Sequence, residues 1–202
     1  MAARFIEPVT LAGRYATLEP LARGHEAAVR AAAADGELWR LWYTSVPSPA
    51  GMAAEIERRL QLQAAGSMLP FTVFDESTPG RGRVVGMTTY MNIDAVHRRV
   101  EIGSTWTSVS SQRTPLNTQC KRLLLGHAFE VLDCIAVEFR THRLNTQSRR
   151  AIERLGAQLD GVLRAHQRCA DGSLRDTAVY SITAAEWPAV RSHLDWQLAR
   201  PR

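Results

Sequence analysis

The order in which strand-like and helix-like segments follow one another is the feature that most constrains the fold of this chain. In its first half, one alternating segment precedes two segments with apolar residues at helical spacing, and further alternating segments follow. Gly36 and Gly66 mark the ends of the two helical patterns. The turn-rich residues 77–82 join two neighbouring strands. The predicted strands are 14–21, 69–76, 83–94 and 98–108, and the predicted helices are 24–36 and about 49–65.

The second half alternates helices with short strands. Its predicted helices are 117–132, 145–157 and about 184–199, and its strands are 135–142, one within 158–172, and 174–182. Gly156 closes the second of these helices, and Pro188 suits the first turn of the third. The apolar face predicted for the first helix consists of Cys120, Leu124, Ala128 and Val131, with Leu123 and Leu132 beside it. This order predicts a mixed α/β fold with a mainly antiparallel sheet flanked by helices. No interior linker is long or polar enough to divide the chain, so we expect one domain over residues 1–202.

Composition narrows the functional classes. The 202 residues are 45% apolar and 22% charged, as in ordinary globular domains, and no apolar run approaches the ~20 residues of a membrane span. The first ten residues lack the apolar core of a signal peptide, which favours the cytoplasm. A net charge of +5 raises the possibility of nucleic-acid binding, but the arginines are dispersed and Lys121 is the only lysine. We therefore expect neither a nucleic-acid nor a membrane partner.

Cysteines and histidines do not form a recognisable metal site. The three cysteines form no CxxC pair and are predicted to be reduced thiols, and the histidines lack metal-ligand spacing. The cysteines are Cys120, Cys134 and Cys169, and four of the six histidines are His97, His127, His142 and His166. We expect no metal.

Two segments resemble a known family. "VEIGSTW…SSQRTPLNTQCKRLLLGHAFE" and "RTHRLNTQSRRAIERLGAQLDGVLR" are similar to segments of the GCN5-related N-acetyltransferases (GNAT), in the branch of the ribosomal-protein N-terminal acetyltransferases. The second segment is the more specific, because the family spacing is matched by Asn145, Ser148, Arg150, Leu155 and Gly156. The resemblance covers about residues 14–187. It implies the GNAT fold, acetyl-CoA as cosubstrate without a metal, and direct acetyl transfer to a primary amine of a protein N-terminus or small molecule. A homodimer is possible.

The resemblance places a cofactor-binding loop at residues 112–117. Family members carry a Q/R-x-x-G-x-G/A loop whose backbone N–H groups meet the coenzyme A diphosphate at a helix N-terminus. Here Gln112 takes the first position, but Pro115 and Asn117 replace the two glycines, and proline lacks an N–H donor. The Asn117 amide, the Thr118 hydroxyl or the charge of Lys121 or Arg122 could compensate. The residues that the resemblance assigns to coenzyme A here are Gln112, Arg113, Thr114, Leu116, Asn117, Thr118 and Lys121.

A simpler interpretation of the same loop is a turn followed by a helix cap. The missing glycines also motivate a different functional class, a non-catalytic acyl-CoA-binding or regulatory module. Turnover with amines would separate these alternatives.

The resemblance gives two residues of the helix 145–157 a role. It implies that the Asn145 amide contacts the pantetheine arm, whereas capping the helix would be a purely structural role. Ser148 is the candidate acid for the departing thiolate, or else only a packed serine. A tyrosine that serves as this acid elsewhere in the family is replaced here by Ile152.

Glu101 is the candidate general base, because its strand borders the acyl site in the family and burial could raise its pKa toward neutrality. The alternative is an outward-facing carboxylate paired with Arg98 or Arg99. The backbone at Ser104, Thr105 and Trp106 is expected beside the thioester carbonyl. Trp39, Trp42 and Tyr43 could line the acceptor pocket or could only cover the sheet.

Overall fold

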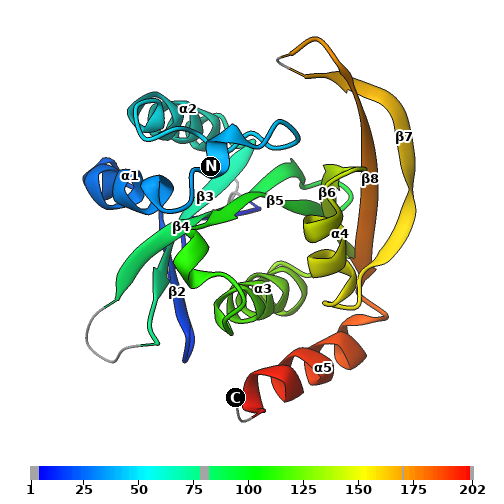
Figure 1. The fold of residues 1–202 in the computed structure, drawn as a ribbon. Coiled ribbons are helices and arrows are strands. Elements are labelled where there is room, and N and C mark those ends of the chain that lie inside the picture. The colour runs from blue at the N-terminus through cyan, green and yellow to red at the C-terminus, as the bar shows by residue number, and fades with distance from the viewer. Residues whose placement is uncertain (1–4, 78–81, 170, 201–202) are drawn as a thin grey trace.

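The computed structural model describes residues 5–77, 82–169 and 171–200. Within them, one sheet is built in the strand order β1-β2-β3-β4-β5-β6-β8-β7 (Figure 1). The strands are β1 (Leu11–Ala12), β2 (Ala16–Pro20), β3 (Met68–Asp75), β4 (Arg83–Asp94), β5 (Arg99–Thr107), β6 (Ala136–His142), β7 (Gln158–Arg168) and β8 (Leu174–Thr183). The helices are α1 (Glu26–Ala34), α2 (Met52–Ala64), α3 (Leu116–Gly126), α4 (Thr146–Glu153) and α5 (Trp187–Ala199).

The sheet is antiparallel except where β5 meets β6. These two strands run parallel and pair only through Arg99–Glu101 on β5 and Ala136–Glu138 on β6. Beyond Glu101 the two strands lie apart. Backbone groups of β5 that would have continued this ladder are therefore left without a strand partner on that side.

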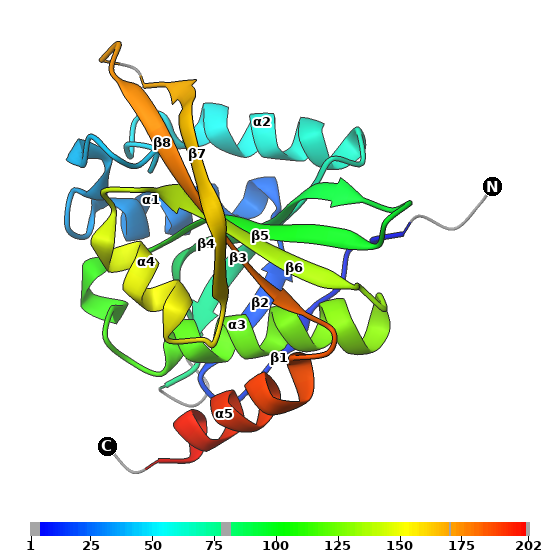
Figure 2. The same ribbon diagram turned by 90° about the vertical axis from the view of Figure 1, so that its right-hand side faces the viewer.

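Helices cover both faces of the sheet. In Figure 2, α2 lies above the sheet, and α3 and α5 lie below it. The side chains of α1 and α2 pack with Met87 and Trp106 in one apolar cluster. Apolar side chains of α3 and α5 join the other and larger cluster, which includes Val100 and Val137 from the two parallel strands. The β7–β8 hairpin extends beyond the rest of the sheet (Figure 2).

The predicted fold class is confirmed, and the elements agree closely with the predicted ranges. Strand β1 was not predicted, because two residues carry no periodic signal. Parts of the predicted connections, at residues 78–81 and 170, lie outside the described residues.

The predicted helix 117–132 is wrong in its last part. Helix α3 ends at Gly126, and a π-helical turn follows over His127–Val131. A π turn holds more residues per turn than an α-helix, so it rotates the residues that follow. As a result Val131 is 67% exposed, whereas Cys120, Leu124 and Ala128 are buried as predicted.

Within the described ranges, no helix combines the length and the apolar character needed to cross a bilayer.

Candidate active site

A cavity of about 1130 Å³ opens where β5 and β6 separate. Its walls come from β5, from parts of β4, β6, β7 and β8, from the N-terminal part of α3, from α4, from α2, and from residues between α1 and α2. Among the residues predicted to form the site, those that line it are Tyr43, Glu101, Ser104, Thr105, Trp106, Gln112, Arg113, Thr114, Asn117, Lys121, Asn145 and Ser148. Segments far apart in the sequence are thus brought to one place.

A bulge shapes the β5 wall of this cavity. Between the paired positions Met87–Trp106 and Thr89–Gly103, β5 contains one residue more than β4. Ser104 adopts a left-handed φ of 47° there, which is unusual for a residue other than glycine. The bulge interrupts the ladder next to the point where β5 has lost β6, so backbone polar groups at 104–106 border the cavity.

The buried side chain of Arg59 on α2 supports this bulge. It is 2% exposed, and it donates hydrogen bonds to the Ser104 carbonyl (3.3 Å) and the Thr89 hydroxyl (2.8 Å). Glu55, one helical turn earlier, accepts a hydrogen bond from Arg59 Nε at 2.7 Å. No pattern in the sequence indicates this role, since Arg58 and Arg59 lie three and four residues after Glu55 and both can pair with it.

Glu101 lies in the cavity wall with little exposure to water. Its carboxylate accepts a hydrogen bond from Asn92 Nδ2 at 2.7 Å and lies 3.5 Å from the Arg140 guanidinium. Burial raises the pKa of Glu101 above its ordinary value, although the Asn92 hydrogen bond and the charge of Arg140 oppose the rise.

The predicted alternative pairing of Glu101 with Arg98 or Arg99 is wrong. Arg98 lies 3.4 Å from Asp133, and Arg99 forms an ion pair with Glu138 at 2.6 Å. A buried carboxylate with a raised pKa is a suitable proton acceptor near neutral pH.

The loop before α3 differs in detail from its predicted geometry. Pro115 is the N-cap residue and Asn117 is already helical, so the left-handed backbone falls at Arg113, with φ 61°. Gln112 Nε2 donates to the Thr107 carbonyl at 3.2 Å, and the Thr114 hydroxyl donates to the Ser111 carbonyl at 2.8 Å. The loop is thereby tied to the end of β5.

Two residues assigned to coenzyme A in this loop lie outside the cavity lining. Leu116 is fully buried in the apolar core, because its side chain points along the inner face of α3. The Thr118 hydroxyl accepts a hydrogen bond from Arg154 Nη1 at 3.1 Å and is equally buried.

Lys121 reaches the cavity from inside the molecule. It is 6% exposed, and its ammonium group donates to the Thr105 hydroxyl at 3.0 Å. Burial lowers the pKa of Lys121 to about 8. Thr105 in turn lies 2.8 Å from the Thr88 hydroxyl, so the lysine is connected to both β5 and β4.

Asn145 caps α4 while it also lines the cavity. Its side-chain oxygen accepts a hydrogen bond from the Ser148 backbone N–H at 3.0 Å. The capping role and the predicted binding role are therefore compatible, since the amide nitrogen does not take part in the cap. Ser148 borders the same cavity one turn into α4.

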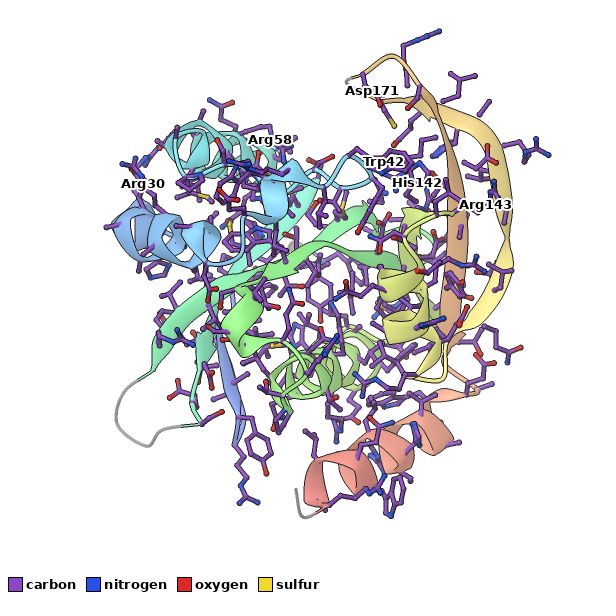
Figure 3. The ribbon with its side chains drawn as sticks, viewed as in Figure 1. Arg30, Trp42, Arg58, His142, Arg143 and Asp171 are labelled. Carbon is purple, nitrogen blue, oxygen red and sulfur yellow. The ribbon has the colours of Figure 1, made fainter. Side chains whose placement is uncertain are left out.

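The aromatic residues before α2 contribute unequally. Tyr43 lines the cavity, but Trp39 and Trp42 do not. Trp42 instead packs edge-on against His142, with ring centroids 5.1 Å apart, and Figure 3 shows the two side chains close together. His142 and Arg175, which both line the cavity, were not predicted as site residues.

Comparison with known proteins assigns the chain that forms this site to a family. The family model of the acetyltransferase (GNAT) domain matches residues 16–158. The chain belongs to the GNAT acetyltransferase family. The resemblance seen in the sequence is confirmed, and with it the assignment as an acetyltransferase.

Individual proteins similar to this GNAT protein are also acetyltransferases by name or share its fold. It is 31% identical over 106 residues to YdaF of Bacillus subtilis (strain 168), which is named as a candidate ribosomal N-acetyltransferase; the match covers 52% of this chain and 57% of YdaF. The GCN5-related N-acetyltransferase from Brucella melitensis is 31% identical, with a TM-score of 0.84, over 96% of this chain and 87% of that one. Mycobacterium smegmatis RimJ, solved with CoA-disulfide, shares the fold at 22% identity and a TM-score of 0.78, over 94% and 95% of the two chains.

Proposed function

We propose that this GNAT protein transfers the acetyl group of acetyl-CoA directly to a primary amine, either a protein N-terminus or a small molecule. One observation supports the proposal above all: the bulged part of β5, which has no β6 partner, meets the N-terminal ends of α3 and α4 and the buried Glu101 in one cavity. The complex of the similarly folded RimJ with CoA-disulfide supports the choice of cosubstrate.

The residues of the cavity suit the steps of direct transfer. The amine nitrogen attacks the thioester carbonyl carbon, and the carbon–sulfur bond then breaks. Glu101, with its raised pKa, takes the proton that the amine must lose before or during attack. Backbone N–H groups at the Ser104 bulge can stabilise the oxyanion, since no strand pairs with them on the β6 side. The Ser148 hydroxyl is the proposed proton donor to the thiolate.

The cofactor arm is proposed to lie between the two helix N-termini. Asn145 Nδ2 would contact the pantetheine, and the loop 112–115 with Asn117 and Lys121 would meet the diphosphate. We further propose that the reaction takes place in the cytoplasm without a nucleic acid, a membrane or a metal. Assembly as a homodimer remains a prediction.

Release of free coenzyme A thiol in the presence of a panel of primary amines tests this function. We expect turnover that depends on both acetyl-CoA and amine. Binding of acetyl-CoA without turnover of any amine would instead support the acyl-CoA-binding module.

Asn145→Ser gives a sharper test of the cofactor site. Serine keeps an oxygen that can cap α4 but removes the amide, so the fold is retained while a cofactor contact is lost. We expect weaker acetyl-CoA binding by about tenfold and a melting temperature without ligand close to that of the wild type. Unchanged binding would remove Asn145 from the cofactor site.

A further inference from the structure

The cavity carries far more positive than negative charge. Its lining contains seven arginines and one lysine but only two carboxylates, and both carboxylates already have cationic neighbours. Glu55 forms ion pairs with Arg58 and Arg59, and Glu101 lies beside Arg140. The cations are Arg58, Arg59, Arg113, Lys121, Arg140, Arg150, Arg154 and Arg175.

These cations separate into groups by the elements that carry them. Arg113, Lys121, Arg150 and Arg154 come from α3, α4 and the loop before α3, where the proposed function places the cofactor. Arg140 on β6 lies 3.5 Å from the carboxylate of Glu101, the proposed general base, and Arg175 on β8 lines the same cavity. The charge of each lowers the pKa of Glu101. The second group therefore faces the acceptor rather than the diphosphate.

Arg175 forms no ion pair at contact distance with a carboxylate in the described part of the chain. Arg140 is paired with Glu138 at 2.9 Å, but the contact recorded for Arg175 is a single hydrogen bond from Nε to the Thr177 hydroxyl, at 3.1 Å. The neighbouring Asp176 pairs with Arg143 and Arg164 instead. Burial lowers the pKa of Arg175, and the charge of Glu101 opposes this only in part and without a direct ion pair.

His142 adds a second donor without an acceptor. It is 4% exposed, lines the cavity, and is the cross-strand neighbour of Thr177. Its Nδ1 accepts a hydrogen bond from the Leu144 backbone N–H at 3.0 Å, so in the neutral ring the proton is on Nε2. Burial and the charge of Arg175 lower the pKa of His142, which keeps the ring neutral at physiological pH.

No described residue accepts a hydrogen bond from His142 Nε2. Buried donors in folded proteins nearly always have an acceptor, so this end of the cavity is complete only with one. Trp42 packs edge-on against the His142 ring (Figure 3).

We propose that the acceptor amine also carries a carboxylate, which binds between the Arg175 guanidinium and His142 Nε2–H while the amine lies at Glu101. The inference rests on the proposed acetyl transfer and deepens it. An arginine fork matches the two oxygens of a carboxylate. That carboxylate could be the α-carboxylate of a free amino acid or an acidic side chain next to a peptide N-terminus.

Two matched pairs of acceptors test the proposal and distinguish these sources. Serine is compared with serinamide, and a peptide that begins Ser-Glu with one that begins Ser-Gln. In at least one pair, we expect kcat/KM for thiol release to be about tenfold to hundredfold higher for the acceptor with the carboxylate. The pair that shows the preference identifies the source.

Arg175→Met assigns the preference to this site. It should reduce the ratio of the two kcat/KM values to about one, and the ratio cancels any effect that the lost charge has on Glu101. Arg175→Lys, which keeps the charge but loses the fork, should retain part of the preference. Arg164→Met removes an equal charge from the same hairpin, at a side chain that is 83% exposed, and should leave the ratio unchanged.

Turnover with no preference in either pair, or a preference that survives Arg175→Met, would overturn the inference and leave the acetyltransferase proposal intact. Absence of turnover with every amine would overturn both.

Discussion

At the scale of single residues, the environment of Glu101 depends on the absence of a side chain two positions later. A Cβ added to Gly103 would lie 2.8 Å from Glu101 Oε1 and 2.7 Å from Met91 Sδ, closer than such atoms approach in proteins. Glycine thus lets the carboxylate fold back against its own strand, where burial raises its pKa. The position of the candidate base and its proton affinity have the same structural origin.

Glu101→Gln should lower kcat/KM for acetyl transfer by about 10²- to 10⁴-fold, the usual contribution of a general base. Only the ionised carboxylate accepts a proton, so wild-type activity should rise with pH through the raised pKa of Glu101. This rise of activity on the acidic side of the pH profile, the acidic limb, should disappear in the variant.

Initial rates of thiol release measured across pH check this prediction. The matched control is Glu138→Gln, since Glu138 is paired with Arg99 and Arg140, and these cations help to hold its pKa below the ordinary value. It should keep the acidic limb. A limb that persists in Glu101→Gln would assign the base to another group.

At the scale of elements, α2 and β5 cooperate through one buried arginine. Arg59→Met leaves the Ser104 carbonyl and the Thr89 hydroxyl without their donor. We expect the free energy of unfolding to fall by about 3 kcal/mol, as when one partner of a buried pair is removed. Arg58→Met should cost less than about 0.5 kcal/mol, because Arg58 is 51% exposed while it pairs with the same Glu55.

Urea unfolding of the two variants measures this difference. Equal losses in stability would mean that the bulge at Ser104 does not depend on Arg59. Weaker acetyl-CoA binding in Arg59→Met alone would link the bulge to the cofactor site.

The N-terminal end of α3 offers a second prediction at this scale. Pro115 has φ −62°, which alanine adopts without strain, so Pro115→Ala restores one backbone N–H while preserving the turn. We expect coenzyme A to bind about tenfold to hundredfold more tightly, the usual contribution of one hydrogen bond to a charged group. Calorimetry should show no gain for pantetheine, which lacks the diphosphate. A gain for both ligands would place the new N–H away from the phosphates.

The elements themselves were predictable because their signals are local. Alternation of apolar residues marks β4 and β5, and closing glycines mark α1, α2 and α4. Burial of Arg59 was not predictable, since it and Arg58 have the same type and nearly the same spacing to Glu55. Which of the two faces the sheet depends on the rotation of α2 against β3 and β4, and that is a tertiary property.

The motifs of the candidate site could be predicted from the sequence, but which side chains line the cavity and which are buried in the core could not. The cavity is lined by Asn145, Ser148 and the loop that begins at Gln112. Their spacing in the sequence matches the family motif, and this motif lies where strands end and helices begin. Leu116 and Thr118 stand in the same motif, yet the turn of α3 directs them into the core. His142 and Arg175 join the cavity only through pairing of β6 with β8, which no local pattern encodes.

At the scale of the whole molecule, the sheet has little pairing between two of its inner strands, β5 and β6. β5 and β6 pair through three residues, whereas β6 and β8 pair through seven. A ligand that lies between the separated strands contacts β5 on one side and α4, which follows β6, on the other. Its binding would therefore connect the two parts of the sheet where their own hydrogen bonds end.

This arrangement predicts how acetyl-CoA changes local stability. Amide hydrogen exchange should slow on both sides of the cavity, at residues 102–107 of β5 and at residues 146–148 of α4. At a ligand concentration of about 100 times Kd, openings that require ligand release are suppressed by about 2.7 kcal/mol, or roughly a hundredfold in rate. Residues 158–164 of the exposed strand β7, which lie outside the cavity lining, should exchange as before and serve as the internal control. Slowing confined to the start of α3 would mean that the ligand binds the loop alone and leaves the two parts of the sheet uncoupled.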